Sequence, residues 1–150
     1  MKKIGSILSM RGQVTEAARP LLLTLFDGRF DTGYRVVDFK IGPHATYDSA
    51  AIGTSARLET EPTGEANSLW NWGDNRQIAW AEYVHMWNVS GDYTAGLTSI
   101  IDPDNMIIED LYLVVNAQDE GNVNYMIQLQ KYDISEWQGA LSMVRNRSQA

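Results

Sequence analysis

The segment MIIEDLYLVV (residues 106–115) carries the strongest strand pattern in the sequence. Successive side chains of a strand point to opposite faces, and here both faces are apolar except at Glu109 and Asp110. The polar stretch NAQDEGN (116–122) is typical of a hairpin connection, and VNYMIQLQKY (123–132) returns with one apolar and one polar face. We therefore expect two neighbouring antiparallel strands in a mainly β protein.

Segments on the N-terminal side of this hairpin extend the β pattern. Strand character is expected at residues 21–26, at 34–41 with Val37, Phe39 and Ile41 on one face, and at 78–89. Residues 42–75 are rich in Gly, Thr, Ser, Asn and Glu, so they predict a long connection in which only 54–60 is extended.

The C-terminal segment predicts a helix. Ser135 followed by Gln138 is a capping-box pattern, and apolar residues at helical spacing indicate a short helix over 135–146. The expected fold is an antiparallel β-sandwich or barrel, jelly-roll-like, with this short C-terminal helix. Residues 1–19 are expected to form an N-terminal arm or edge strand, and residues 20–150 a single β-sandwich domain.

Composition narrows the possible functions. The chain has 150 residues and a net charge of −7, from 12 Lys and Arg against 19 Asp and Glu. From Asp92 to Glu136 the sequence has nine acidic residues and one basic residue, Lys131. Such an acidic surface repels phosphate backbones, so nucleic acid is not an expected partner. No run of 18 apolar residues occurs, so no membrane span is expected.

Motifs for catalysis and metal binding are also missing. The sequence lacks cysteine, which excludes a disulfide scaffold, a thiolate zinc site and a cysteine nucleophile. It contains two histidines, His44 and His85, and neither a nucleophile elbow nor a glycine-rich phosphate loop. Glu109 and Asp110 point to opposite faces of a strand, so they cannot act together as a catalytic pair. We expect no enzymatic activity, no catalytic residues, no metal site and no cofactor.

Two of the expected strands have apolar side chains on both faces. An ordinary antiparallel sheet buries one face and exposes the other to solvent, so a second apolar face indicates an interface with another chain. The candidate interface residues are Trp80, Tyr83, Trp87, Tyr112 and Val114. The alternative is that the C-terminal helix and the 42–75 connection cover these outer faces. If they do not, the protein is an obligate oligomer or a lattice subunit.

The long connection ends in Trp70 and Trp72, which are the candidates for an exposed aromatic loop. Flat aromatic faces stack on sugar rings, so a carbohydrate-binding β-sandwich module is an alternative function. Packing of these rings against the core or a partner is the simpler interpretation.

Three segments resemble known proteins: DGRFDTGYRV (27–36), NYMIQLQKYDIS (124–135) and MVRNRSQ (143–149). They resemble small virion structural proteins of marine tailed bacteriophages. The resemblance implies a β-rich capsid decoration (cement) protein that binds neighbouring copies of itself, as a trimer, and the major capsid protein. It implies a location in the virion after synthesis in the host cytoplasm, and the family supplies no catalytic residues. A tail or neck structural component is a further alternative.

Overall fold

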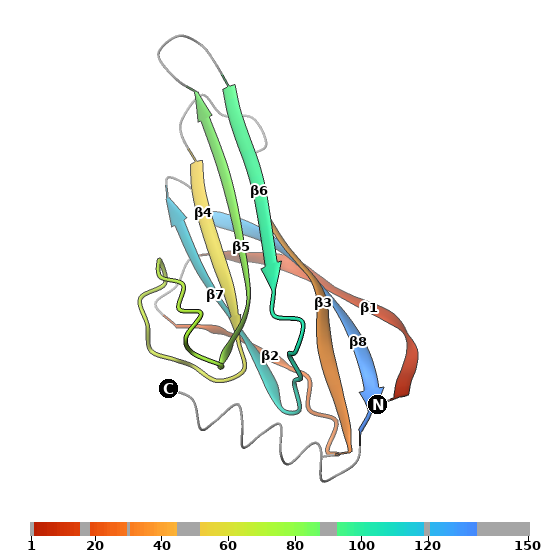
Figure 1. Cartoon of the computed structure of the whole chain (residues 1–150). Coiled ribbons are helices and arrows are strands. Elements are labelled where there is room, and N and C mark those ends of the chain that lie inside the picture. The colour runs from red at the N-terminus through yellow and green to blue at the C-terminus, as the bar shows by residue number, and fades with distance from the viewer. Residues whose placement is uncertain are drawn as a thin grey trace.

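A computed structural model describes residues 2–15, 19–29, 31–44, 52–87, 93–118 and 121–134. All regular structure in these residues is β (Figure 1). The strands are β1 (Lys2–Thr15), β2 (Leu21–Thr24), β3 (Thr32–Pro43), β4 (Ile52–Glu59), β5 (Gln77–Trp87), β6 (Tyr93–Ile101), β7 (Asp110–Gln118) and β8 (Asn122–Asp133). The prediction of a mainly β protein is confirmed, whereas the expected helix at 135–146 lies outside the described residues.

The strands form two antiparallel sheets that pack face to face. The small sheet has the order β1-β8-β3, and the large sheet has the order β2-β7-β4-β5-β6. The architecture is therefore a β-sandwich, the first of the two expected forms. Of the two expectations for residues 1–19, an arm or an edge strand, residues 2–15 form an edge strand, because β1 is the outermost strand of the small sheet.

The core lies between the two sheets. Inward-facing side chains of β3 and β8 meet those of β4 and β7, and these side chains are buried. The largest of them are Phe39, Ile41, Leu58, Leu111, Leu113, Ile127 and Leu129. The alternation expected for β8 is confirmed, since Val123 and Ile127 are inside while Asn124 and Met126 are exposed.

A β-bulge changes the alternation expected for β3. The register against β8 shifts between Val36 and Asp38. A bulge inserts one extra residue, which reverses the faces on either side of it. Val36 is therefore buried at 2% exposure, while Val37 is 40% exposed and lies on the opposite face from Phe39. The prediction that Val37 shares a face with Phe39 was wrong for this reason.

The free edge of β3 is closed by the connection between β6 and β7. Tyr34 exchanges two backbone hydrogen bonds with Ile107, at 2.8 and 2.7 Å. One step along, the Asn105 side chain accepts from the Val36 amide at 2.9 Å and donates to the Val36 carbonyl at 3.3 Å. The amide group of Asn105 thus replaces the backbone of a neighbouring strand.

The strands differ from the sequence expectation in further respects. Residues 106–109 belong to this connection, and β7 begins only at Asp110. The extended stretch expected at 54–60 corresponds to β4, which is a central strand between β7 and β5 rather than part of a long connection. The edge strand β6 was not expected, because residues 94–99 are mostly small or polar and contain Gly96.

Candidate functional site

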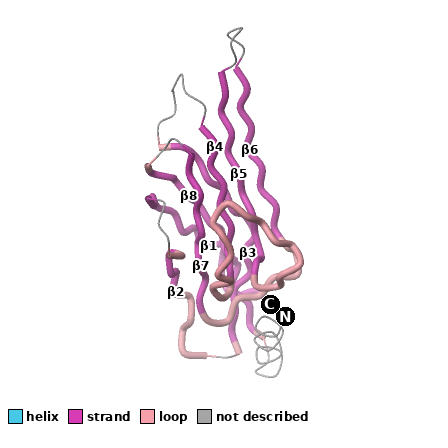
Figure 2. Tube along the Cα trace, turned by 90° about the vertical axis from the view of Figure 1, so that its left-hand side faces the viewer, coloured by secondary structure: helices cyan, strands magenta, loops and turns pink. Residues whose placement is uncertain are grey.

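A buried arginine organises the long loop after β4. Arg57 is 1% exposed and points away from the core, because its neighbours Ala56 and Leu58 face inward. Its guanidinium donates to Glu59 Oε2 at 3.0 Å. It also donates to loop carbonyls, those of Leu69 at 2.7 Å, Ala66 at 2.9 Å and Glu65 at 3.0 Å. One side chain therefore holds residues 60–76, the covering loop, against the outer face of the large sheet (Figure 2).

Other polar contacts fix the far half of the covering loop. Gln77 Oε1 accepts from the Asn71 amide at 2.8 Å and from the Trp80 indole at 3.1 Å. The Asn71 side chain donates to Glu65 Oε1 at 2.7 Å. Such side chain–backbone bonds let an irregular segment hold one conformation without strand pairing.

A salt bridge closes the base of the covering loop. The Arg76 guanidinium donates to Asp74 Oδ2 at 2.8 Å, and this hydrogen bond lowers the pKa of the Asp74 carboxyl despite its burial. The same bond raises the pKa of Arg76. The loop thus returns to β5 through an ion pair that remains charged at neutral pH.

The covering loop presents apolar side chains to solvent. Trp72 is 62% exposed and Leu69 is 54% exposed. The Trp72 ring lies 5.6 Å from the Trp80 ring, with their planes tilted by 52°. Trp72 and Leu69 are thus the exposed apolar side chains of a loop that is held from beneath, and we refer to these two side chains as the protrusion. Trp70 is only partly exposed.

The candidate interface residues of the sequence analysis lie on the large sheet. Trp80 and Val114 are buried at 5% and 2% exposure, in register with Arg57 beneath the covering loop. Tyr112 is partly exposed, and Tyr83 packs against the inner core. The side chain of Trp87 lies outside the described residues. The expectation of an exposed apolar face at Trp80 and Val114 is therefore corrected, because the covering loop lies over these side chains. The C-terminal helix, which the alternative interpretation also named as a cover, lies outside the described residues.

Exposed apolar residues occur instead on β1. Residues 2–9 of β1 are exposed along their whole length, whereas residues 10–15 alternate between partly buried and exposed. Ile4, Ile7 and Leu8 are 39%, 53% and 50% exposed. Gly5 has a φ of 68° at an irregularity in the pairing with β8, and Gln130 donates to the backbone carbonyl of Gly5 at 3.3 Å. The N-terminal half of β1 therefore pairs with β8 on one side and leaves its other edge open, with exposed apolar side chains along it.

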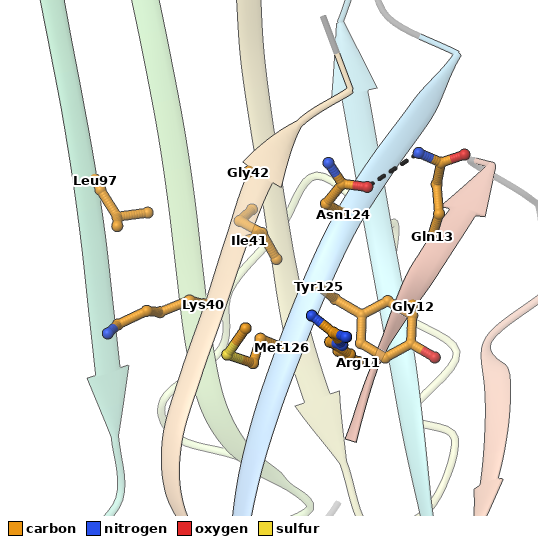
Figure 3. A pocket seen from close by; sticks show the side chains of 10 residues that line it. All are labelled: Arg11, Gly12, Gln13, Lys40, Ile41, Gly42, Leu97, Asn124, Tyr125 and Met126. Carbon is orange, nitrogen blue, oxygen red and sulfur yellow. Dashed lines mark hydrogen bonds between the residues drawn. The ribbon is translucent and has the colours of Figure 1, made fainter. Parts of the chain in front are cut away.

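A hollow of about 700 Å³ lies on the small sheet. Its lining comes from three successive positions on each of β1, β8 and β3, and from Leu97 of β6 (Figure 3). The side chains that alternate with the inward-facing Ile41 and Tyr125 point to the outer face; they are Arg11, Gln13, Lys40, Asn124 and Met126.

Polar and apolar groups are separated within this hollow. Gln13 donates to Asn124 Oδ1 at 3.0 Å, and Asn124 donates to the Pro43 carbonyl at 3.1 Å, so one wall is a hydrogen-bonded amide ladder. Met126 lies between Arg11 and Lys40 in the strand register. Lys40 pairs with Asp38 at 3.3 Å. The hollow is therefore apolar at its centre, with a cation on each side.

A third cluster of charges fixes the turn between β2 and β3. The Lys131 ammonium donates to Asp27 Oδ2 at 2.9 Å and lies 5.6 Å from the centre of the Tyr34 ring. This hydrogen bond lowers the pKa of Asp27 and raises that of Lys131. Arg29 and Asp31 form a second, exposed pair in the same turn. These contacts are satisfied within the chain, so the cluster is structural.

No metal-binding group of three His, Asp or Glu side chains is found in the described part of the chain. None of its residues forms a helix that is long and apolar enough to cross a membrane. No family model, no curated protein and no solved structure matches this chain. The candidate surfaces of the described residues are therefore β1, the covering loop and the hollow. The sequence indicated Trp72, but it gave no signal for the hollow, which depends on the register of three strands.

Proposed function

We propose that this protein is a structural subunit of a virus particle, a capsid decoration (cement) protein that attaches to the major capsid protein through β1. The observation that carries the proposal is the N-terminal half of β1, where Ile4, Ile7 and Leu8 are exposed on a strand whose outer edge is unpaired. Natural proteins usually shield such edges, because an open strand pairs with any suitable neighbour. An edge left open over this length suits attachment by strand addition, in which backbone hydrogen bonds bind and alternate side chains select the partner.

The rest of the described structure supports a binding role rather than catalysis. Arg57 and Asn105 are buried polar side chains with structural roles, since they hold the covering loop and the β3 edge in place. The charged pair of Lys131 and Asp27 is satisfied within the turn that it fixes. The resemblance of residues 27–36 and 124–135 to small phage virion proteins supports the same proposal. We propose no enzymatic activity and no cofactor.

The test is attachment to particles. Particles from a virus whose copy of this gene is deleted are mixed with purified protein, recovered on a gradient and analysed by quantitative mass spectrometry. The wild-type protein should remain bound in many copies, as expected for a repeated shell, whereas few copies would indicate a neck or tail position. Ile7→Ser/Leu8→Ser should lower the bound amount strongly.

Leu22→Ser is the matched control, because Leu22 is also 50% exposed but lies on β2 of the other sheet. It should bind as the wild-type protein does. Absence of the protein from purified particles would contradict the virion role, and equal binding of all three proteins would contradict attachment through β1.

The carbohydrate-binding alternative has one observation in its favour, the exposed Trp72 ring. Sugar platforms gain from several open aromatic faces, but the neighbouring Trp80 ring is buried and tilted by 52°. A glycan screen of the wild-type protein and Trp72→Ala tests this alternative. A hit that disappears in the variant would favour the carbohydrate-binding module over the decoration protein.

A further inference from the structure

The hollow and the covering loop have complementary chemistry. The hollow offers two exposed apolar side chains: Met126, 37% exposed between Arg11 and Lys40, and Leu97, 52% exposed on the far side of Lys40 (Figure 3). The Arg11 guanidinium has no ion pair among the described residues. Because Lys40 pairs with Asp38, Arg11 is the cation that the hollow offers to an acidic partner.

The covering loop offers the opposite combination. Trp72 and Leu69 protrude from it, and three carboxylates and one guanidinium lie within residues 60–76. The Glu65 carboxylate is held beside the protrusion by its 2.7 Å hydrogen bond from Asn71, the residue before Trp72. The protrusion is thus apolar with an acidic margin.

We propose that the covering loop of one copy inserts Trp72 and Leu69 into the hollow of a second copy. A volume of about 700 Å³ lies in the range of sites that enclose a compact ligand of this size. Trp and Arg are the residue types that most often dominate binding at protein interfaces, and a rigid loop loses little entropy on docking. This inference rests on the proposed assembly role and names a second copy as one partner, but its test needs no particle.

The position of the two surfaces determines the kind of assembly. The covering loop lies on the outer face of the large sheet, and the hollow lies on the outer face of the small sheet. A copy that has docked its loop therefore keeps its own hollow open for another copy. Such a head-to-tail contact builds a closed ring, such as a trimer, if the rotation from one subunit to the next returns to the first subunit. If it does not, the contact builds an open chain of subunits.

The hollow can be filled without disturbing the fold. Gly42 lies in the hollow on the same face of β3 as Lys40, and a Cβ added there meets no atom within 4 Å. Gly42→Phe should therefore block the hollow. Gly96→Phe is the matched control, since Gly96 is an exposed strand glycine whose Cβ also meets nothing within 4 Å.

The experiment is a complementation test by analytical ultracentrifugation at micromolar concentration. The wild-type protein and Gly96→Phe should assemble beyond the dimer. Trp72→Ser and Gly42→Phe should each be monomeric, because one lacks the insert and the other lacks the receiving site. Their equimolar mixture should form one-to-one dimers and nothing larger, since one functional insert and one functional hollow remain.

A charge-reversal variant of the hollow provides a second test. Arg11→Glu is introduced into the Trp72→Ser chain, which supplies the hollow. It should raise the dissociation constant of the mixed dimer by about tenfold or more, as expected for an arginine that contributes strongly to an interface. Lys3→Glu, which changes a lysine of the same strand outside the hollow, should leave the dimer unchanged.

Circular dichroism and urea denaturation establish that each variant is folded. Any of three results would overturn the inference. They are a monomeric wild-type protein, assembly of Trp72→Ser or Gly42→Phe alone, and a mixture of the two that stays monomeric. These outcomes are independent of attachment through β1, which is intact in every chain used for the blocking test. Binding of a glycan by a monomeric wild-type protein would assign Trp72 to the carbohydrate instead.

Discussion

Replacing Arg57 with methionine should release the covering loop while leaving the sandwich folded. The substitution removes the donor to Glu59 and to the carbonyls of Glu65, Ala66 and Leu69. Glu59 is 0% exposed, so its carboxylate would remain buried without its cation. Removing one partner of a buried ion pair costs about 3–5 kcal/mol.

This cost is large compared with the total stability of a domain, which is about 5–15 kcal/mol. The chain can avoid part of it by opening the loop, since the carbonyls and Glu59 then reach water. We therefore expect a lower urea midpoint, faster protease cleavage within residues 60–76 and a red-shifted tryptophan emission. The emission shifts because Trp80, which is 5% exposed, loses its cover.

Two further variants make the interpretation specific. Arg57→Met/Glu59→Met should recover part of the lost stability, because a buried pair replaced by apolar residues leaves no unpaired charge. Arg29→Met removes a guanidinium that is 61% exposed and should change the midpoint little. An unchanged midpoint and unchanged protease resistance in Arg57→Met would refute the role of this arginine in holding the loop.

Three other predictions concern the edges and turns of the small sheet. Asn105→Ala removes both side-chain hydrogen bonds to the β3 edge and should lower the free energy of unfolding by about 1–3 kcal/mol, measured by urea denaturation. Gly33→Ala should lower the thermal midpoint, because its Cβ would lie 3.2 Å from the backbone oxygen of Ile107, which is fixed by its hydrogen bond from Tyr34. Gly42→Ala should have little effect, and equal midpoints would contradict the close approach. Asp27 has a pKa below its ordinary value of 3.8, so its contribution to stability is present above that pH and is lost as the pH falls through the folded-state pKa. Lys131→Met removes the hydrogen bond responsible, and the stability difference from the wild-type protein should therefore shrink on acidification below about pH 4.

The strands with strong local patterns could be predicted from the sequence. Residues 123–132 have clear alternation and turn residues before them, so β8 and its two faces followed from side-chain type alone. The second apolar face of residues 111–115 was also identified. Its cover by the 42–75 connection was only one of two alternatives, because a buried arginine that binds loop carbonyls has no signature in the hydrophobic pattern.

Features that depend on contacts distant in sequence could not be predicted. The bulge between Val36 and Asp38 changes faces within a segment whose alternation looks regular. Asn105 closes the β3 edge from about 70 residues away in sequence, and an asparagine after an aspartate and a proline is first interpreted as a turn residue. The hollow arises from the alignment of three strands, so no single segment of the sequence encodes it.

The pairing of β1 with β8 has a consequence for synthesis. Lys2 pairs with Asp133, so β1 has no partner in its own chain until residues about 130 positions later have been translated. Contacts this far apart in sequence slow folding, because a long segment of chain must lose its freedom before the pairing stabilises it. On a messenger read by several ribosomes at once, the nascent β1 segments of adjacent chains are exposed to one another throughout this delay. A nascent strand can then pair with the β8 of a neighbouring copy, which makes exchange of β1 between copies the characteristic misfolding route of this topology.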